Sequence, residues 1–600
     1  MPQIGYPTLS AKACRKSCES IIYQKLRGPR DIRLMKFLPG PTPCCTLITV
    51  DINKAPPYMA LSYTWGSSDL EDDFVVDGKS VAITTNLGEA LRKLHTYLRE
   101  KALMLWADLI CINQTDIQEK SHQIKLMNAI YRCAERVGVW LGEAHGNSNL
   151  VLERLDKWTN EFTRLTEVCE DDIHQAMHSV SPSNEVFYDS NGKVNPLLWQ
   201  ALRALFHRDW WERAWVVQEA TALAPSRTYL FCGDYCTDWC HFRTAIWFYN
   251  RVGYYDSDSI DMPFEVTMAT HLDAFRATME SGAYMRLLSV LECIRNFKCE
   301  DPRDKVYAGL GMASDVLDSD IVPDYRKSLE EVFIDVVQFV LSHPSLHSLD
   351  FLGAVIRPYN APLHWDDDLP SWVPDWRVQV TSYALKKYMD TEEFGSERAY
   401  SASANLQRPI RIDGRRLHCE GFEVDTVTRV WSPCWSNLVE SEIQTERSWM
   451  PEENDIPYIL GGTVLEAFNR TLVADIGRND MTADQLQRGF AVDWKLLNTR
   501  TSDLSLLDKK RRIWMLIDIK RTTFGRRLFE TKAGLIGLGA AATEVGDSVC
   551  VLFGGQVLYL LRAKNNSDDY EFTGECYVHG MMDGEAVKDL DLPGREFVIV

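Results

Sequence analysis

The length, composition and charge of the chain exclude several classes of protein. Its 600 residues are too many for one hydrophobic core, so about two to four domains are expected. The composition is 45% hydrophobic, which suits packed cores, and no apolar run approaches the roughly 20 residues of a membrane-spanning helix. A formal charge of −20 opposes the counterion release that holds proteins on nucleic acid. We therefore expect a cytoplasmic globular protein with no membrane span and no nucleic-acid partner.

Basic residues outnumber acidic ones in residues 1–32, which we interpret as a solvated basic leader. This region lacks the charged-then-apolar order of a signal peptide, so the 16 cysteines are expected to be reduced thiols. Cys232, Cys236 and Cys240 beside His241 do not have the usual spacing of zinc ligands. No metal site is expected there.

Strands and helices alternate through the first part of the chain. Short strands are predicted at 33–39 and 45–50, and Asp77-Gly78 lies between two β-prone runs, which predicts a hairpin. Apolar periodicity then predicts strand 58–66, helix 86–98, strand 103–107, helix 116–134 and strand 136–142. Strands separated by single helices imply a parallel sheet with right-handed crossovers, buried on both faces.

Two of these strands end in side chains that could bind a ligand. The stretch 58–66 ends in a group that includes Tyr63 and Trp65. The strand that starts at Leu103 is followed by three polar residues: Asp108, Asn113 and Gln114. In an open α/β sheet, ligands bind just beyond the carboxyl ends of the strands. These residues are therefore candidates for a binding site, although Asp108 and Asn113 could equally cap turns or satisfy buried backbone groups.

Four residue pairs have the spacing of a helix capping box: Asn86 with Glu89, Asp116 with Glu119, Asp209 with Glu212, and Ser328 with Glu331. Glu119 is accordingly interpreted as a structural residue. The third pair affects the position of Glu219. A helix that starts at Asp209 would place Glu219 about ten residues in, roughly 15 Å from the helix start. A start nearer Arg213 is also consistent with the sequence.

The helix expected within 208–219 places Trp211, Trp215, Gln218 and Glu219 on one side. Aromatic walls beside a carboxylate lower the local dielectric and hold flat ligands, but the same arrangement also serves core packing. Trp65 and Trp215 are open to both interpretations. A helical glutamate such as Glu219 is also commonly a solvated or salt-bridged residue, and Arg213 could hold it.

The remainder of the chain divides into two regions. A polar interval at 179–193 is interpreted as an insertion, and residues 226–405 are predicted to be mainly helical. Residues 406–600 contain short strands with Gly-rich turns, which indicates a small β barrel or sandwich.

Three motifs resemble those of the fungal heterokaryon incompatibility (HET) domain, in the order of that family. They are YMALSYTWG at 58–66, LWADLICINQ at 105–114 and RAWVVQE at 213–219. The resemblance assigns residues 33–225 to a HET domain. Three later segments resemble those that often accompany the domain in full-length fungal proteins: 301–307, 370–376 and 579–585.

The resemblance implies a fungal protein of allorecognition, the non-self recognition that leads to programmed cell death after unlike hyphae fuse. The HET domain is also thought to be related to the TIR fold, a flavodoxin-like parallel sheet with flanking helices. Some TIR domains cleave NAD with a glutamate that follows a tryptophan by four positions on a helix. Trp215 and Glu219 have that spacing.

Two hypotheses of different classes follow. In the first, the chain needs no cofactor, and its HET domain associates with itself or with a partner protein. In the second, NAD is a substrate and Glu219 is the catalytic carboxylate of a TIR-like NAD glycohydrolase, with NAD held by Tyr63, Trp65, Asp108, Asn113, Gln114 and Trp215. Cys111 could act as a nucleophile only if a base lowered its pKa. An enzyme needs these residues around a pocket, whereas an interaction module could bury them as core.

Overall fold

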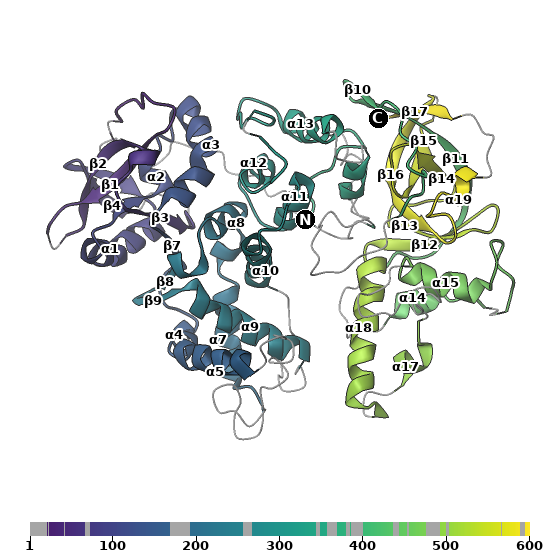
Figure 1. Ribbon diagram of the computed structural model, residues 1–600, viewed down its shortest axis with the longest axis horizontal. Helices are drawn as coiled ribbons and strands as arrows, with labels where there is room; N and C mark the ends of the chain where they lie inside the picture. Colours follow the sequence, from purple (N-terminus) through teal and green to yellow (C-terminus); the bar gives the residue numbers. More distant parts are fainter. Residues whose placement is uncertain are drawn as a thin grey trace. The chain divides into compact units, whose positions relative to one another are not determined.

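The computed structural model (Figure 1) describes residues 21–600 except 22, 41, 67–71, 169–192, 256–266, 318, 344–348, 357–368, 380–384, 386–399, 436–442, 453–454, 476–491, 500–502, 566 and 589–593. Residues 1–20 and 22 of the predicted leader, and residues 179–192 of the predicted insertion, lie outside the described residues. The chain forms two compact units. Unit 1 contains 1–283, 297–312 and 322–325, and unit 2 contains 284–296, 313–321 and 326–600. The domain boundaries predicted near 225 and 405 stay predictions.

Unit 1 is built on a nine-stranded sheet with the order β5-β4-β2-β1-β6-β3-β7-β8-β9. Its strands are β1 (Asp31–Phe37), β2 (Cys44–Asp51), β3 (Tyr58–Tyr63), β4 (Asp72–Val76), β5 (Lys79–Ile83), β6 (Met104–Trp106), β7 (Arg136–Trp140), β8 (Thr228–Cys232) and β9 (Tyr235–Asp238). The four strands β6, β3, β7 and β8 are mutually parallel. Along the sheet they lie in the order β6, β3, β7, β8, so the first of them in the chain, β3, lies between the second, β6, and the third, β7. Every residue of β3 is buried, as expected for a central strand covered on both faces.

The sheet is mixed rather than wholly parallel. β1 runs antiparallel to β6, and the β4–β5 and β8–β9 pairs are antiparallel hairpins. A two-residue connection allows only antiparallel pairing, because parallel strands need a long crossover. The predicted Asp77-Gly78 turn is confirmed, and both residues have positive φ, 51° and 77°.

Helices connect and cover the strands of unit 1 (Figure 1). They are α1 (Thr85–Glu100), α2 (Asp108–Cys111), α3 (Ile117–Cys133), α4 (Ser148–Leu152), α5 (Leu155–Val168), α7 (Pro196–Phe206), α8 (Ala214–Thr221), α9 (Trp239–Tyr255), α10 (Met268–Glu280) and α12 (Asp304–Leu310). Short 3-10 turns lie at η1 (Ile52–Lys54), η2 (Asp209–Glu212) and η3 (Pro225–Arg227).

Two of the capping predictions are corrected. Helix α1 is capped by Thr84, whose hydroxyl accepts from the Leu87 amide, so Asn86 is not the cap. The helix expected to start at Asp209 is broken at Arg213, whose φ and ψ of −81° and 136° are extended. Asp209–Glu212 is therefore a separate 3-10 turn, and Glu219 lies within the short helix α8 that starts at Ala214.

Unit 2 combines helices with an antiparallel β structure. The helices are α11 (Leu287–Ile294), α13 (Leu329–Ser342), η5 (Asp350–Ala354), α14 (Gln444–Ser448), α15 (Val464–Leu472), α17 (Trp494–Asn498), α18 (Leu506–Thr523) and α19 (Glu585–Lys588). The strands are β10 (Arg411–Asp413), β11 (Arg416–Val430), β12 (Arg526–Thr531), β13 (Ile536–Ala540), β14 (Ser548–Leu552), β15 (Leu558–Ala563), β16 (Asp569–Val578) and β17 (Arg595–Ile599).

The strands of unit 2 close on themselves. β11, β12, β13, β16, β15 and β14 pair in turn, and β14 pairs back to β11. Such closure makes a barrel rather than a sandwich, with β10 paired to β11 alone outside the closed ring. The helical middle region and the β-rich end of the chain agree with the sequence-based expectation. In the part of the chain that the structure describes, no helix combines the length and the apolarity needed to cross a membrane.

Candidate functional site

The candidate residues of unit 1 start at the carboxyl ends of the parallel strands β3 and β6. Trp65 follows β3, and its indole Nε1 donates to Oδ2 of Asp108 at 2.9 Å. Asp108 opens α2 just after β6, and the Gln114 amide donates to its carbonyl oxygen at 2.9 Å. The two strand ends are thus joined by hydrogen bonds, as expected where parallel strands finish side by side.

Tyr63 is the last residue of β3 and is 2% exposed. Burial and the neighbouring Asp108 carboxylate hold the pKa of the Tyr63 hydroxyl well above its usual value, so the phenol stays neutral. The Arg213 guanidinium donates to the Tyr63 carbonyl oxygen. Arg213 therefore ties the third motif to the first through the backbone of β3.

Glu219 lies at the centre of the cluster and is 5% exposed. Its Oε2 accepts a hydrogen bond of 2.5 Å from the Ser62 hydroxyl, and the Trp210 indole donates to Ser62 Oγ at 2.9 Å. Burial raises the pKa of Glu219 to about 7, against the lowering effects of the Arg213 charge and the Ser62 hydrogen bond. Near neutral pH the carboxyl group therefore exists as a mixture of its neutral and charged forms.

The second glutamate of the motif region, Glu119, has a different environment. Its carboxylate accepts two hydrogen bonds from the Arg33 guanidinium, at 2.6 and 2.9 Å, and one from the backbone amide of Asn113 at 2.8 Å. Burial alone would raise the pKa of Glu119, but these donors lower it below the usual value. Asp116 caps α3 as predicted, but the Glu119 side chain bonds Asn113 rather than completing a capping box.

Trp215 lies apart from this hydrogen-bond network, although it precedes Glu219 by one helical turn. Its Nε1 donates to Oδ2 of Asp304 at 3.0 Å, and the Tyr325 hydroxyl donates to Oδ1 of the same carboxylate at 2.6 Å. Burial raises the pKa of Asp304 to about 6. The segment 301–307, which the sequence associated with the domain, thus holds the outer side of α8 through Trp215.

Cys111 is not suited to nucleophilic catalysis. Its side chain is buried, and burial raises the pKa of the thiol to about 12. The Arg33 charge and the hydrogen bond from the backbone amide of Ala107 lower this pKa, but burial outweighs them, so the thiol stays protonated near neutral pH.

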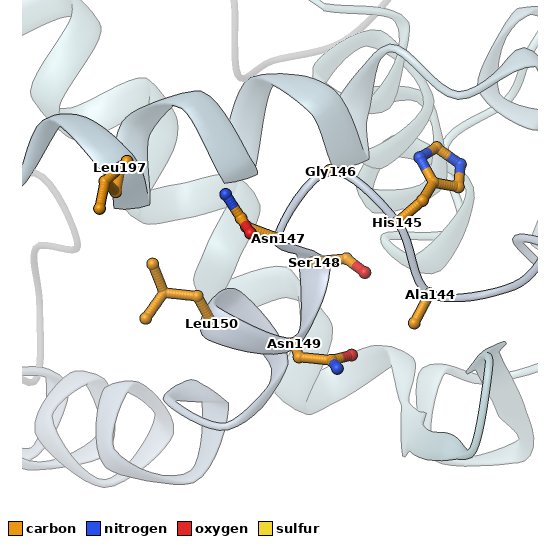
Figure 2. Close-up of a pocket in the computed structure, with 8 residues that line it drawn as sticks. All are labelled: Ala144, His145, Gly146, Asn147, Ser148, Asn149, Leu150 and Leu197. Atoms are coloured by element: carbon orange, nitrogen blue, oxygen red, sulfur yellow. The ribbon is translucent and has the colours of Figure 1, made fainter.

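A cavity of about 510 Å³ lies beyond the end of β7, in the loop that leads into α4 (Figure 2). It is lined by Ala144, His145, Gly146, Asn147, Ser148, Asn149, Leu150 and Leu197. None of the predicted site residues lines this cavity. The cavity and the Glu219 cluster are therefore separate features of unit 1.

Sequence reasoning missed several residues that hold the cluster together. Ser62 belongs to the polar end of the 58–66 motif but was given no role, and Trp210 lay outside the recognised motifs. Asn86 was interpreted as a cap, but its amide donates to the carbonyl and hydroxyl oxygens of Thr64 at 2.6 and 2.9 Å, and it accepts from Trp140. A polar residue inside an otherwise apolar strand is the one signal that could have identified Ser62, because buried hydroxyls need partners.

Comparison with known proteins agrees with these motifs. Residues 58–219 match the family model described as Heterokaryon incompatibility protein (HET), a span that contains all three motifs. Residues 510–600 match the Het-6 beta-barrel domain, in the region where the strands of unit 2 close into a barrel.

A curated relative extends the similarity over most of the chain. It is "Heterokaryon incompatibility protein 6, OR allele" of Neurospora crassa. The match has an aligned length of 642, with 24% identity, and covers 90% of this chain and 91% of the relative. No solved structure matches the chain.

Proposed function

We propose that this chain acts in heterokaryon incompatibility as a recognition protein, in which association of the HET domain with itself or with a partner protein leads to cell death. The domain match and the printed name of the Neurospora relative support the incompatibility role. The observation that carries the recognition mechanism is the burial of Glu219 against Ser62.

The motif residues mainly bond one another. Ser62 donates to Glu219 and accepts from Trp210, Trp65 donates to Asp108, and Arg213 donates to the backbone of β3. Buried polar groups that are paired in this way specify a unique core arrangement. A catalytic carboxylate, by contrast, must reach its substrate. The cluster therefore supports a role as the interior of an interaction domain.

A substitution that retains the hydrogen bond separates recognition from catalysis. Full-length protein and its Glu219→Gln variant are expressed in fungal strains that carry like or unlike alleles, and the survival of fused cells is measured. We expect both proteins to kill fused cells in the unlike background, because the amide oxygen of the introduced glutamine still accepts from Ser62. Loss of killing in a folded Glu219→Gln variant would contradict the recognition mechanism.

A second candidate is a TIR-like NAD glycohydrolase with Glu219 as its catalytic carboxylate. The observation that favours it is the pKa of Glu219, about 7, since groups perturbed by burial cluster at functional sites. The order of β6, β3, β7 and β8 also corresponds to the start of the flavodoxin-like order 2-1-3-4-5. A fold analogy of this kind raises the expectation of an activity without supplying it.

NAD consumption tests this candidate directly. Full-length protein, dilute and concentrated, is incubated with NAD beside Glu219→Gln and a matched Glu212→Gln control, since Glu212 is a nearby glutamate that pairs with Lys298. The glycohydrolase is supported if NAD disappears with the wild type and the control but not with Glu219→Gln. Absence of turnover at every concentration would leave recognition as the function.

A further inference from the structure

The loop 455–463 of unit 2 exposes an unusual concentration of apolar surface. Ile456, Ile459 and Leu460 are 45%, 58% and 45% exposed. Large apolar side chains that are exposed singly are ordinary, but a group of them within five residues marks an interaction site.

The backbone of this loop is held in one conformation by its own hydrogen bonds. Pro457 and Thr463 pair as an antiparallel bridge, and the amide of Val464 donates to the carbonyl oxygen of Ile456 at 2.9 Å. Inside this bridge, two glycines with φ of 101° and 72°, Gly461 and Gly462, make the turn. The loop ends at the capping box of α15, whose N-cap is Thr463.

Tyr458 anchors the loop to the barrel. It is 4% exposed, and its hydroxyl donates to the carbonyl oxygen of His579 at 3.2 Å and accepts from the Ile536 amide at 3.1 Å. Beside it, Gly580 has φ of 80°, and a Cβ there would lie 2.7 Å from Cδ1 of Leu460. The segment 579–585 lies outside the span of the three motifs. Its first two residues, His579 and Gly580, contact Tyr458 and Leu460 of the apolar loop.

The charged residues within positions 451–469 of the sequence are all acidic, and the next charged residue, Arg470, is paired with Asp475. Residues 451–469 contain Glu452, Glu453, Asp455 and Glu466 and no lysine or arginine. Glu452, Asp455 and Glu466 are exposed. Anionic membrane surfaces attract basic segments and would repel this one. A second copy of the chain, with the same acidic loop and a net charge of −20, would also be repelled.

We propose that the loop 455–463 is a docking site for a partner protein that presents an apolar pocket with a basic rim. Ile459 and Leu460 enter the pocket, and the acidic residues meet the rim. Because the anchored loop is already ordered, little conformational entropy is lost when it binds. This inference rests on the proposed recognition function and names the surface of the barrel unit that makes the contact.

Binding of defined probes tests the surface independently of cell death. A library of short random peptides is selected on the full-length protein, and the affinity of the selected peptides is measured for wild type, Ile459→Asp and Val545→Asp. Val545 is an equally suitable site for an aspartate, since it is 62% exposed and lies elsewhere in unit 2. We expect apolar peptides with basic residues, bound at least about tenfold more weakly by Ile459→Asp and unchanged by Val545→Asp.

Several results would overturn the proposal. In the peptide experiment, these are failure to select such peptides and equal binding of the peptides by both variants. In separate measurements, they are binding of the loop to phosphatidylcholine and phosphatidylserine vesicles, and dimerisation of the wild type that Ile459→Asp abolishes. A photoreactive amino acid at position 459 that cross-links to another part of the same chain would also overturn it, because the loop would then be covered in cis.

The incompatibility assay distinguishes failure of this surface from failure of the proposed function. If the wild type kills fused cells and Ile459→Asp kills equally well, the docking surface is wrong and the function stands. If the wild type does not kill, the function fails, and the peptide measurement still decides the surface. Reduced killing by Ile459→Asp with normal killing by Val545→Asp supports both.

Discussion

Two glutamates of unit 1 show how the partner of a carboxylate decides its charge: Glu119, whose side chain is 9% exposed, and the buried Glu219. Glu119 is paired with the Arg33 guanidinium, which is 2% exposed, and its pKa is lowered. Glu219 receives a hydroxyl hydrogen bond from Ser62, and burial raises its pKa to about 7. The comparison teaches that burial fixes a negative charge only where a cation is buried with it.

The largest effect is expected from removing that cation. Arg33→Ala leaves the Glu119 carboxylate buried without its partner, so the protein should lose about 3–5 kcal/mol of folding free energy. Denaturant unfolding measures the loss. Arg92→Ala is the control, because Arg92 pairs with Asp72 at the surface, where an ion pair contributes about 0–1 kcal/mol. Equal losses in the two variants would show that burial of the Arg33 pair has no energetic weight.

The second effect is the part of the pH dependence of stability that Glu219 contributes. The pKa of Glu219 is raised from 4.5 to about 7 on folding. The protonated carboxyl group therefore adds to the free energy of unfolding in full below pH 4.5, and this added stability is lost as the pH rises to about 7. The total change is about 3 kcal/mol. Unfolding is compared for wild type and Glu219→Gln across this range. A difference between the two proteins that does not change with pH would contradict the raised pKa.

Removing the hydroxyl partner of Glu219 should have a smaller effect. Ser62→Ala removes one hydrogen bond to the Glu219 carboxyl group and takes away the acceptor of the Trp210 indole, which costs about 1–3 kcal/mol. Thermal unfolding compares this variant with Ser80→Ala, an exposed strand serine. If Ser62→Ala is as stable as the control, the hydrogen bonds to Ser62 do not stabilise the cluster.

The smallest effect is expected at the edge of the cluster. Trp65→Phe keeps an aromatic ring but removes the donor to the half-buried Asp108, at a cost of about 0.5–1.5 kcal/mol. Denaturant midpoints of wild type and variant measure this difference. A loss larger than that of Ser62→Ala would place the main stabilising contact at Asp108 rather than at Glu219.

The predictability of the site follows the distance over which its interactions act. The three motifs, the Asp77-Gly78 hairpin and the strand ends at Tyr63 and Asp108 were predicted because short-range patterns specify them. The start of α8 could not be predicted, because Asp209 and Glu212 satisfy a capping pattern that the chain uses only for a 3-10 turn. The parallel strands were predicted, but the antiparallel pairing of β1 with β2 and β6 and of β8 with β9 was not.

The sequence by itself determined the order of strands and helices, the family of the domain and the residues at the strand ends, since turn and capping chemistry acts over a few residues. Only the tertiary structure decided the partners. Ser62 meets Glu219 across 157 positions of sequence, and Arg33 meets Glu119 across 86. Burial and charge depend on such distant neighbours, so the different states of two similar glutamates could be assigned only once the fold had brought those neighbours together.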